Sequence, residues 1–175
     1  QATFDIAAKG LPASPGAAVG MAVFDADEAE KMAQSGQPVI LVRPETTPDD
    51  IHGLYAAQGV LTSRGGMTSH AAVVARGLGK PCVSGCESLV IDASKGVMTV
   101  GGRSLNTGEI LTIDGSKGHV IFGEVPLVQP SFTDDFRQLL DLADSVAALE
   151  VWANADTPDD AQRARSFGAR GIGLC

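Results

Sequence analysis

RGGMTSHAAVVARGLGKP, residues 64–81, is the stretch that decides the fold of this 175-residue chain. Its glycine pair leads into Thr68 and Ser69, two residue types that favour the N-cap of a helix. The alanine- and valine-rich run that begins at His70 predicts a short helix, which the glycines and the proline at the end of the stretch terminate. Because residues 59–63 (GVLTS) read as a buried strand, we expect the order strand, glycine turn, helix.

The residues on either side extend this pattern in two ways. Toward the N-terminus, a loop rich in Pro and Gly is expected at residues 10–20. Strands and helices then alternate, with strands at 19–24 and 38–42 and helices at 25–33 and 47–58. Toward the C-terminus, short β-type runs between residues 82 and 125 alternate with Gly, Ser, Asp and Asn, which predicts a small antiparallel or barrel-like sheet.

The last third of the chain reads as a boundary followed by the start of another domain. Residues 126–131 (PLVQPS) are the expected boundary. The elements after it are a helix, a strand, a second helix and the start of a second strand, at residues 132–148, 149–153, 158–167 and 171–175. One β-α unit and half of another cannot close a core. We therefore predict an α/β domain at 1–125, a linker helix at 126–149 and the truncated start of a larger α/β domain at 150–175. The alternative is an appendage packed on the first domain.

Composition places the chain among globular proteins, with 44% hydrophobic and 19% charged residues. The net charge of −8 argues against non-specific binding to nucleic acid or to an anionic membrane. No apolar run approaches the roughly 20 residues that a membrane helix needs. The first residues, QATFDIAAKG, resemble no signal peptide and lack an initiator Met, so we expect a piece of a longer chain.

The three cysteines, Cys82, Cys86 and Cys175, are an odd number that does not fit a disulfide framework. A zinc site built on Cys82 and Cys86 would need two further ligands, and no suitably spaced candidates lie near them. We therefore predict no metal site and reduced thiols, as in a cytoplasmic protein.

One segment of the chain contains no acidic residue. Ile51–Cys86 contains no Asp or Glu in 36 residues, although acids make up 21 of the 175 residues and about four would be expected there. The same segment contains two of the three histidines, His52 and His70. The acid-free window therefore surrounds the glycine turn of the deciding stretch.

The physics of this turn favours a phosphoryl group. The candidate phosphate cradle consists of Arg64, Gly65, Gly66, Thr68 and Ser69. Glycines allow close approach of the backbone, hydroxyls can donate, and a helix N-terminus presents unpaired N–H groups and partial positive charge. His70 lies in the first helical turn, where the helix dipole disfavours imidazolium, and a neutral imidazole is a competent nucleophile toward phosphorus. The alternative is a histidine with a structural role at a common type of helix start.

The other polar residues point to ordinary structural roles. His52 and His119 are expected to be structural. Asp49–Asp50 are expected to be acids at a helix start rather than an acid/base pair. Arg76 and Lys80 contact either a phosphate or only solvent at a helix end, and the sequence does not choose between these two possibilities. The turn matches neither a P-loop nor a dinucleotide-binding fingerprint, so it is not expected to bind a nucleotide alone.

Residues 65–77 (GGMTSHAAVVARG) resemble the phosphohistidine signature of the enzymes that interconvert phosphoenolpyruvate and pyruvate. This group includes pyruvate, phosphate dikinase, phosphoenolpyruvate synthase and enzyme I of the sugar phosphotransferase system. Met67 and Ser69 favour the dikinase branch, because the synthase and enzyme I usually have Arg at the position of Met67 and the synthase usually has Cys at the position of Ser69. Residues 10–20, 43–53 (RPETTPDDIHG) and 168–175 (GARGIGLC) also resemble the dikinase branch.

The resemblance implies a swivelling β/β/α phosphohistidine domain between an N-terminal nucleotide-binding domain and a C-terminal (β/α)8 barrel that binds phosphoenolpyruvate and pyruvate. Residues 10–16 and 126–131 are the expected hinges. His70 is the implied catalytic nucleophile, and Thr68 matches a threonine that a regulatory kinase/phosphorylase modifies in some members. Mg²⁺ and a monovalent cation, NH₄⁺ or K⁺, are implied cofactors bound mainly outside this chain. The full-length enzyme is implied to be a homodimer.

Two other functions remain as alternatives. The chain could belong to a phosphoenolpyruvate synthase or to a phosphocarrier similar to enzyme I, which passes phosphate from His70 to a protein partner. It could also be a structural domain that retains a vestigial signature.

Overall fold

The computed structural model describes residues 5–128 and 134–173, with side chains in the second range from residue 138 onward. The chain divides into two units, Gln1–Val128 and Gln129–Cys175, and each has sheet structure of its own. The predicted boundary at 126–131, the first residues of the helix predicted at 132–148 and the end of the strand predicted at 171–175 fall partly outside the described residues.

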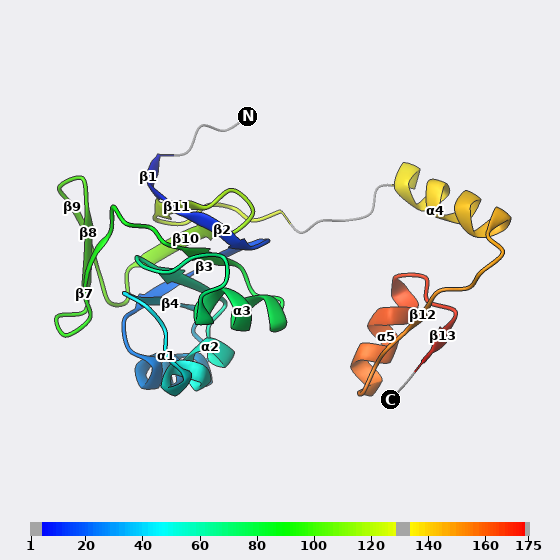
Figure 1. Ribbon diagram of the computed structural model, residues 1–175, viewed down its shortest axis with the longest axis horizontal. Coiled ribbons are helices and arrows are strands. Elements are labelled where there is room, and N and C mark those ends of the chain that lie inside the picture. The colour runs from blue at the N-terminus through cyan, green and yellow to red at the C-terminus, as the bar shows by residue number, and fades with distance from the viewer. Residues whose placement is uncertain (1–4, 129–133, 174–175) are drawn as a thin grey trace. The chain divides into compact units, whose positions relative to one another are not determined.

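Unit 1 is built on an eight-stranded mixed sheet (Figure 1). In spatial order its strands are β1 (Ile6–Lys9), β11 (His119–Phe122), β10 (Ile110–Asp114), β3 (Ala17–Val23), β4 (Val39–Arg43), β5 (Gly59–Thr62), β6 (Cys82–Ser84) and β2 (Leu11–Ser14). The pairs β3–β4, β4–β5 and β5–β6 are parallel. The outer pairs are antiparallel. The parallel centre agrees with the α/β pattern predicted for the first half of the chain.

Each parallel connection contains a helix, as a crossover between parallel strands requires. The connecting elements are α1 (Ala26–Gln34), the 3-10 turn η1 (Pro48–Asp50) with α2 (Ile51–Ala56), and α3 (His70–Gly77). Figure 1 shows the three α-helices on one side of the sheet. The strands β3, β4 and β5 therefore have their carboxyl ends at the same end of the sheet, next to the starts of the helices that follow them. Ligands commonly bind at this end of such sheets.

The core lies on both faces of this sheet, and β4 shows how the sequence produces it. Val39 and Leu41 pack in the cluster on the helix side, whereas Ile40 and Val42 pack in the cluster on the other face. All four side chains are fully buried. A strand buried on both faces reads as a continuous apolar run, which is why PVILV has no polar residue.

The second face is covered by a three-stranded antiparallel sheet of β7 (Val90–Asp92), β8 (Val97–Val100) and β9 (Arg103–Asn106). The prediction of one small antiparallel or barrel-like sheet for residues 82–125 is right for these three strands. β10 and β11 also pair antiparallel with each other, as predicted, but they and β6 belong to the large sheet, where they pair with strands from the first half of the chain. Alternation of residue types identifies a strand but carries no information about its partner.

The predicted N-terminal loop is also largely wrong. Residues Leu11–Ser14 form β2, which pairs with β6, and the N–H of Gly10 donates to the carbonyl of Gly118. The strand tolerates Pro12 because β2 lies at the edge of the sheet, where one side of its backbone needs no partner. Residues 11–14 are therefore paired in the sheet, and only residues 10, 15 and 16 of the hinge expected at 10–16 lie outside a strand.

Unit 2 contains α4 (Asp134–Val146) and a short β-α-β unit made of β12 (Trp152–Ala153), α5 (Pro158–Ser166) and β13 (Gly171–Ile172). The two strands are parallel. Thr157 caps α5 by accepting a hydrogen bond from the N–H of Asp160, and Pro158 occupies the first turn. These elements agree with the helix, strand, helix and strand predicted for this region. None of the helices within the described ranges is long and apolar enough to cross a membrane.

Candidate functional site

His70 is the first residue of α3 and lies just beyond the carboxyl end of β5. Ser69 is the N-cap, with extended backbone angles, and its Oγ accepts a hydrogen bond of 3.4 Å from the N–H of Ala72. The predicted order of strand, glycine turn and helix is therefore present. Of the two candidate caps, Ser69 is used for capping and the Thr68 side chain is left exposed.

The His70 ring is half-buried and makes one recorded contact. Its Nδ1 lies 3.0 Å from Oγ1 of Thr46, a side chain that is only 8% exposed and follows β4. Nε2 has no hydrogen-bond partner among the described residues. If Nδ1 carries the ring proton and donates it to Thr46, the lone pair is on Nε2, on the side of the ring that is free to react.

Thr46 is a site residue that the sequence analysis missed. It lies in the dikinase-like stretch at 43–53, but nothing in its own position indicated a contact with a residue 24 positions later. The contact depends on the parallel pairing of β4 with β5, which places Arg43 opposite Thr62. The turns that follow these two strands are thereby brought side by side.

Gly65 and Gly66 play different roles in the turn. Gly65 has φ +101, a left-handed backbone conformation, and a Cβ there would lie 2.9 Å from Cβ of Ser69. Position 65 therefore requires glycine. Gly66 has open space around its missing Cβ, with no heavy atom within 4 Å, so a ligand rather than the protein can approach it.

The turn presents a series of backbone donors. Arg64, Ser69, Ala72 and Val73 have recorded acceptors for their N–H groups. Within the described residues, no acceptor is recorded for the N–H groups of Gly65, Gly66, Met67, Thr68, His70 and Ala71. Unpaired N–H groups at the positive end of a helix are the arrangement that binds anions.

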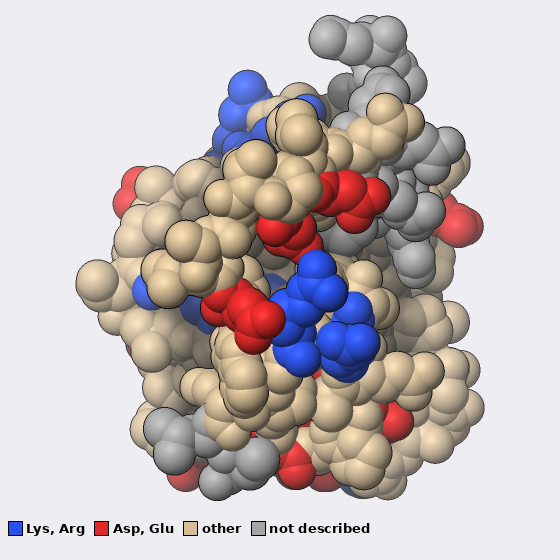
Figure 2. Space-filling model, turned by 90° about the vertical axis from the view of Figure 1, so that its right-hand side faces the viewer, with Lys and Arg blue, Asp and Glu red and all other residues tan. Residues whose placement is uncertain are grey.

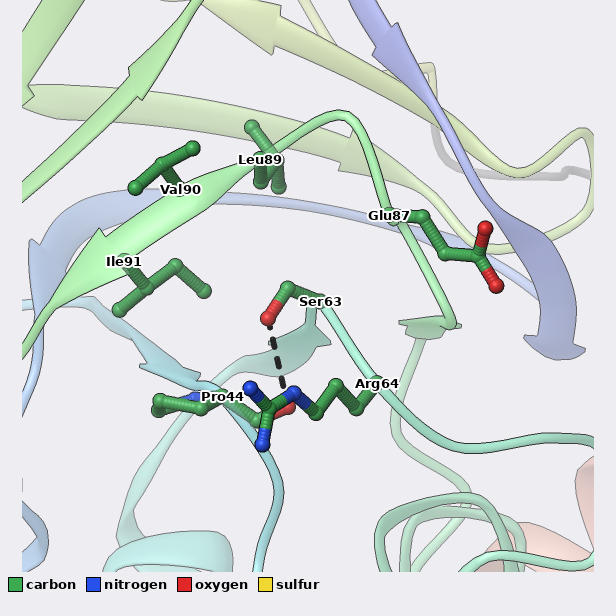
Figure 3. A pocket seen from close by; sticks show the side chains of 7 residues that line it. All are labelled: Pro44, Ser63, Arg64, Glu87, Leu89, Val90 and Ile91. Atoms are coloured by element: carbon green, nitrogen blue, oxygen red, sulfur yellow. Dashed lines mark hydrogen bonds between the residues drawn. The ribbon is translucent and has the colours of Figure 1, made fainter.

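Arg64 lies in a neighbouring groove of about 590 Å³ (Figure 3). The groove is lined by Pro44, Ser63, Arg64, Glu87, Leu89, Val90 and Ile91. Figure 3 shows the guanidinium of Arg64 extended over Pro44, with Glu87 pointing to another side. His70 is not among the described residues that line this groove. A place for Arg64 in the phosphate cradle therefore stays a prediction.

Arg76 and Lys80 hold the backbone rather than facing only solvent. Arg76 donates from Nη2 to the carbonyl of Met67 at 2.6 Å and from Nη1 to that of Ala13 at 3.3 Å. Nζ of Lys80 reaches carbonyls at the end of α2, those of Leu54 (3.2 Å), Tyr55 and Ala57 (2.5 Å). Burial lowers the pKa of Lys80. These contacts rule out the possibility that the two side chains contact only solvent, and a contact with phosphate stays a prediction.

The other two described histidines lie apart from these contacts. Nε2 of His52 lies 2.9 Å from Oδ1 of Asp27 on α1. His119 lies in β11 and pairs with Asp114 of β10 and Lys9 of β1. Both places fit the structural roles that the sequence predicted.

The described cysteines are buried thiols. Cys82 and Cys86 have no exposed surface, and burial raises the pKa of Cys82 to about 12. Within the described parts of the chain, no three His, Cys, Asp or Glu side chains gather closely enough to hold a metal ion. The Mg²⁺ that the family resemblance implies is expected mainly outside this chain, and its place there stays a prediction. Cys175 lies outside the described residues.

Charge on the molecular surface is mixed. On the face in Figure 2, Lys and Arg side chains gather directly beside Asp and Glu side chains, among a majority of uncharged residues.

The chain is similar to known proteins over nearly its whole length. Residues 35–118 match the family model described as PEP-utilising enzyme, mobile domain. The pyruvate, phosphate dikinase of Rhizobium meliloti (strain 1021) is 54% identical over 171 residues, which are 98% of this chain and 19% of that protein. Pyruvate, phosphate dikinase 1, chloroplastic, of Arabidopsis thaliana is 54% identical over 170 residues, 97% of this chain and 18% of that protein.

The chain thus spans about a fifth of the length of these relatives. Among solved structures, the N-terminal domain of Enzyme 1 – Nitrogen matches 79% of this chain and 98% of its own, with 13% identity and a TM-score of 0.44. The fold assignment given above rests on the strand pairing of this chain and not on that match.

Proposed function

Since the chain belongs to the family of PEP-utilising enzymes through residues 35–118, we propose that it carries the phosphohistidine of a pyruvate, phosphate dikinase. The whole enzyme would interconvert ATP, phosphate and pyruvate with AMP, pyrophosphate and phosphoenolpyruvate. The observation that carries this proposal is the placement of His70. One ring nitrogen contacts Thr46, and the other has no partner in the described chain beside a turn of unpaired N–H groups.

The reaction would use Nε2 of His70 as nucleophile and carrier. Nε2 attacks the β-phosphorus of ATP, the bond from that phosphorus to the oxygen bridging it to the α-phosphate breaks, and AMP leaves. An oxygen of inorganic phosphate then attacks the outer phosphorus of pyrophosphoryl-His70, and pyrophosphate leaves. In the last step the enolate oxygen of pyruvate attacks the remaining phosphorus and the N–P bond breaks. The proton from the pyruvate methyl group passes to a base on the domain that binds pyruvate.

The residues around His70 would contribute to the transfer steps in two ways, by orienting the ring and by binding the phosphoryl oxygens. Nδ1 of His70 donating to Thr46 would hold the ring in one tautomer and one orientation, so that Nε2 keeps its lone pair. The N–H groups of the turn would hydrogen-bond the phosphoryl oxygens and stabilise their charge in both transfer steps. Thr68 and Ser69 would contribute through their N–H groups or hydroxyls, and Arg64 would have to turn out of its groove to join them.

The remaining parts of the enzyme are also proposals. Residues 1–125 would be the swivelling domain, 126–149 the linker helix and 150–175 the start of the (β/α)8 barrel, with a nucleotide-binding domain on the N-terminal side. Mg²⁺ and NH₄⁺ or K⁺ would bind mainly outside this chain and would neutralise phosphate charge there. A homodimer and a cytoplasmic location complete the proposal, and the buried thiols of Cys82 and Cys86 fit that location.

Thr68 would be the target of a regulatory kinase/phosphorylase where such a partner exists. Its side chain is exposed, and the helix does not need its hydroxyl because Ser69 is the cap. A phosphate on Thr68 would place negative charge beside His70 and oppose phosphorylation of the ring.

The test is to incubate the full-length protein with labelled phosphoenolpyruvate and to map the phosphopeptide under alkaline conditions. Label is expected on His70, absent in His70→Ala and unchanged in His52→Ala and His119→Ala. Label that survives in His70→Ala would overturn the assignment. Labelled ATP then separates the alternatives, because the dikinase converts added phosphate to pyrophosphate, the synthase does not, and an enzyme I-like carrier does not use ATP.

A further inference from the structure

Of four consecutive carbonyl oxygens in the glycine turn, three accept hydrogen bonds from side chains of unit 1, and the fourth lies close against the backbone of Gly85. Oγ1 of Thr62 donates to the carbonyl of Arg64 at 2.8 Å. Oγ of Ser84 donates at 3.3 Å to the carbonyl of Gly66, which also accepts from the N–H of Ser69 at 3.1 Å. Nη2 of Arg76 donates to the carbonyl of Met67 at 2.6 Å. The carbonyl of Gly65 lies so close to Gly85 that a Cβ there would be 2.5 Å from the oxygen.

This arrangement determines where the N–H groups point. In a trans peptide the N–H is directed opposite to the carbonyl of the preceding residue, and the described chain has no cis peptide bond. Carbonyls fixed toward β5, β6 and α3 therefore turn the N–H groups of Gly65, Gly66, Met67 and Thr68 away from the protein body. These four N–H groups are among those without an acceptor in the described residues.

The three side chains come from different elements, and each is well placed to hold its carbonyl. Thr62 and Ser84 are fully buried at the ends of β5 and β6. Arg76 is on α3, two turns after His70, and its second nitrogen is anchored to the carbonyl of Ala13 in β2. We call Thr62, Ser84 and Arg76 the carbonyl clamp.

We propose that the carbonyl clamp is a set of positioning residues for phosphotransfer at His70, an inference that rests on the proposed function. None of the three needs to touch the phosphoryl group. They hold the carbonyl dipoles inward, so that the turn meets a phosphoryl group with N–H donors only. Without the clamp, the glycine pair can rotate its peptide planes at low cost and turn carbonyl oxygens toward the anion, which repels it.

A positioning role for the clamp predicts a change in the pKa of the phosphoryl group on His70, which a purely structural role does not predict. Hydrogen bonds from N–H groups favour the dianionic form of a phosphoryl group and lower its pKa. In full-length enzyme phosphorylated with phosphoenolpyruvate, ³¹P NMR is used to titrate phospho-His70. The phosphoryl pKa is expected to rise by roughly one pH unit in Thr62→Val, Ser84→Ala and Arg76→Met. At a fixed ratio of phosphoenolpyruvate to pyruvate, the ratio of phosphorylated to free enzyme is expected to be about tenfold lower in these variants than in the wild type.

Matched variants separate positioning from folding. Thr112→Val removes another buried hydroxyl that donates to a carbonyl, that of Gly123 at 2.7 Å, far from the turn in sequence. Arg103→Met removes another anchored arginine, one that pairs with Asp5. Both should lower the free energy of unfolding and leave the ³¹P titration as in the wild type. Arg76→Lys, which can still reach one carbonyl, should restore part of the wild-type behaviour.

The outcomes are distinguishable. A folded Arg76→Met protein whose phospho-His70 titrates and equilibrates like the wild type would overturn the role of the clamp while leaving the proposed function intact. Because Arg76 is exposed, this variant decides the question even if Thr62→Val or Ser84→Ala does not fold. Failure of the wild-type enzyme to phosphorylate His70 would instead overturn the proposed function itself.

Discussion

The starts of α2 and α3 follow adjacent parallel strands at the same edge of the sheet, yet they satisfy their backbone donors in opposite ways. Before α2, the carboxylate of Asp50 accepts a 2.9 Å hydrogen bond from the N–H of Thr47, and Arg43 forms an ion pair with the same carboxylate at 3.3 Å. Before α3, the only recorded cap is the neutral hydroxyl of Ser69. The turn that leads to His70 contains no acid.

The start of α1 resembles that of α2. Asp25 caps it by accepting a 3.0 Å hydrogen bond from the N–H of Glu28, and two acids occupy its first turn. At the start of α1 and at the η1 turn that leads into α2, the protein's own carboxylates thus accept hydrogen bonds from backbone N–H groups. The start of α3 has no such carboxylate, and this difference supports the proposed phosphate site without reference to any relative.

The largest expected effect comes from the backbone approach that holds the α3 turn. Gly85→Ala would add a Cβ 2.5 Å from the Gly65 carbonyl, at a position with φ +61. We expect the free energy of unfolding to fall by about 3 kcal/mol and the turn to be displaced. Chemical denaturation measures the first effect and labelling of His70 the second.

Gly101→Ala is the matched control, because Gly101 has a similar φ of +56 but no heavy atom within 4 Å of the position that a Cβ would take. It should cost only about 1 kcal/mol, the backbone strain alone. Equal losses in the two variants would show that the contact between residues 85 and 65 does not shape the turn.

The next effect comes from giving α3 the kind of start that α1 has. Ser69→Asp keeps a good N-cap, so the free energy of unfolding should change by less than about 0.5 kcal/mol. The added charge would repel the phosphoryl group by about 2–3 kcal/mol at a distance of several ångströms, so that phosphorylation of His70 should fall by roughly a hundredfold. Quench-flow measurement of the phosphohistidine gives this rate.

The reverse exchange, Asp25→Ser at the start of α1, should leave that rate unchanged. If Ser69→Asp phosphorylates as fast as the wild type, the absence of acids from the α3 turn has no bearing on phosphotransfer. The contrast between the helix starts would then be a matter of helix capping alone.

Much of this site could be predicted from the sequence because its signals are local. The cap at Ser69, the helix at His70 and the acid-free window all lie within one short stretch, so periodicity and capping preferences were enough. The strands β3, β4 and β5 were predicted for the same reason.

What could not be predicted depends on strand pairing. The contact between Thr46 and His70, the hold of Ser84 on Gly66 and the anchoring of Arg76 to Ala13 each join residues that only the sheet order brings together. The same limit explains why β6, β10 and β11 were placed in the wrong sheet, since residue alternation carries no information about which strand lies alongside.

A smaller effect is expected where the two helix starts touch. Thr46→Val keeps the shape of the side chain but removes the hydroxyl from Nδ1 of His70, so the ring loses its orienting contact. Phosphorylation should slow by about tenfold, the equivalent of one hydrogen bond. Thr46→Ser should retain the wild-type rate, and the neighbouring Thr47→Val should affect stability only, because its hydroxyl contacts Asp50. A normal rate in Thr46→Val would mean that the ring is oriented by its surroundings without this hydroxyl.

The smallest expected effect concerns the other end of α2. Lys80 donates to three carbonyls there, so the C-terminus of α2 is satisfied within the protein. Lys80→Met should lower the free energy of unfolding by about 1 kcal/mol through loss of this cap, and Lys80→Arg should recover part of it. Because Lys80 follows α3 directly, its substitution tests whether phosphate is handled only at the start of α3. Its loss should leave the rate of phosphorylation at His70 unchanged if only the start of α3 handles phosphate, whereas a slower rate would show that Lys80 contributes to the site.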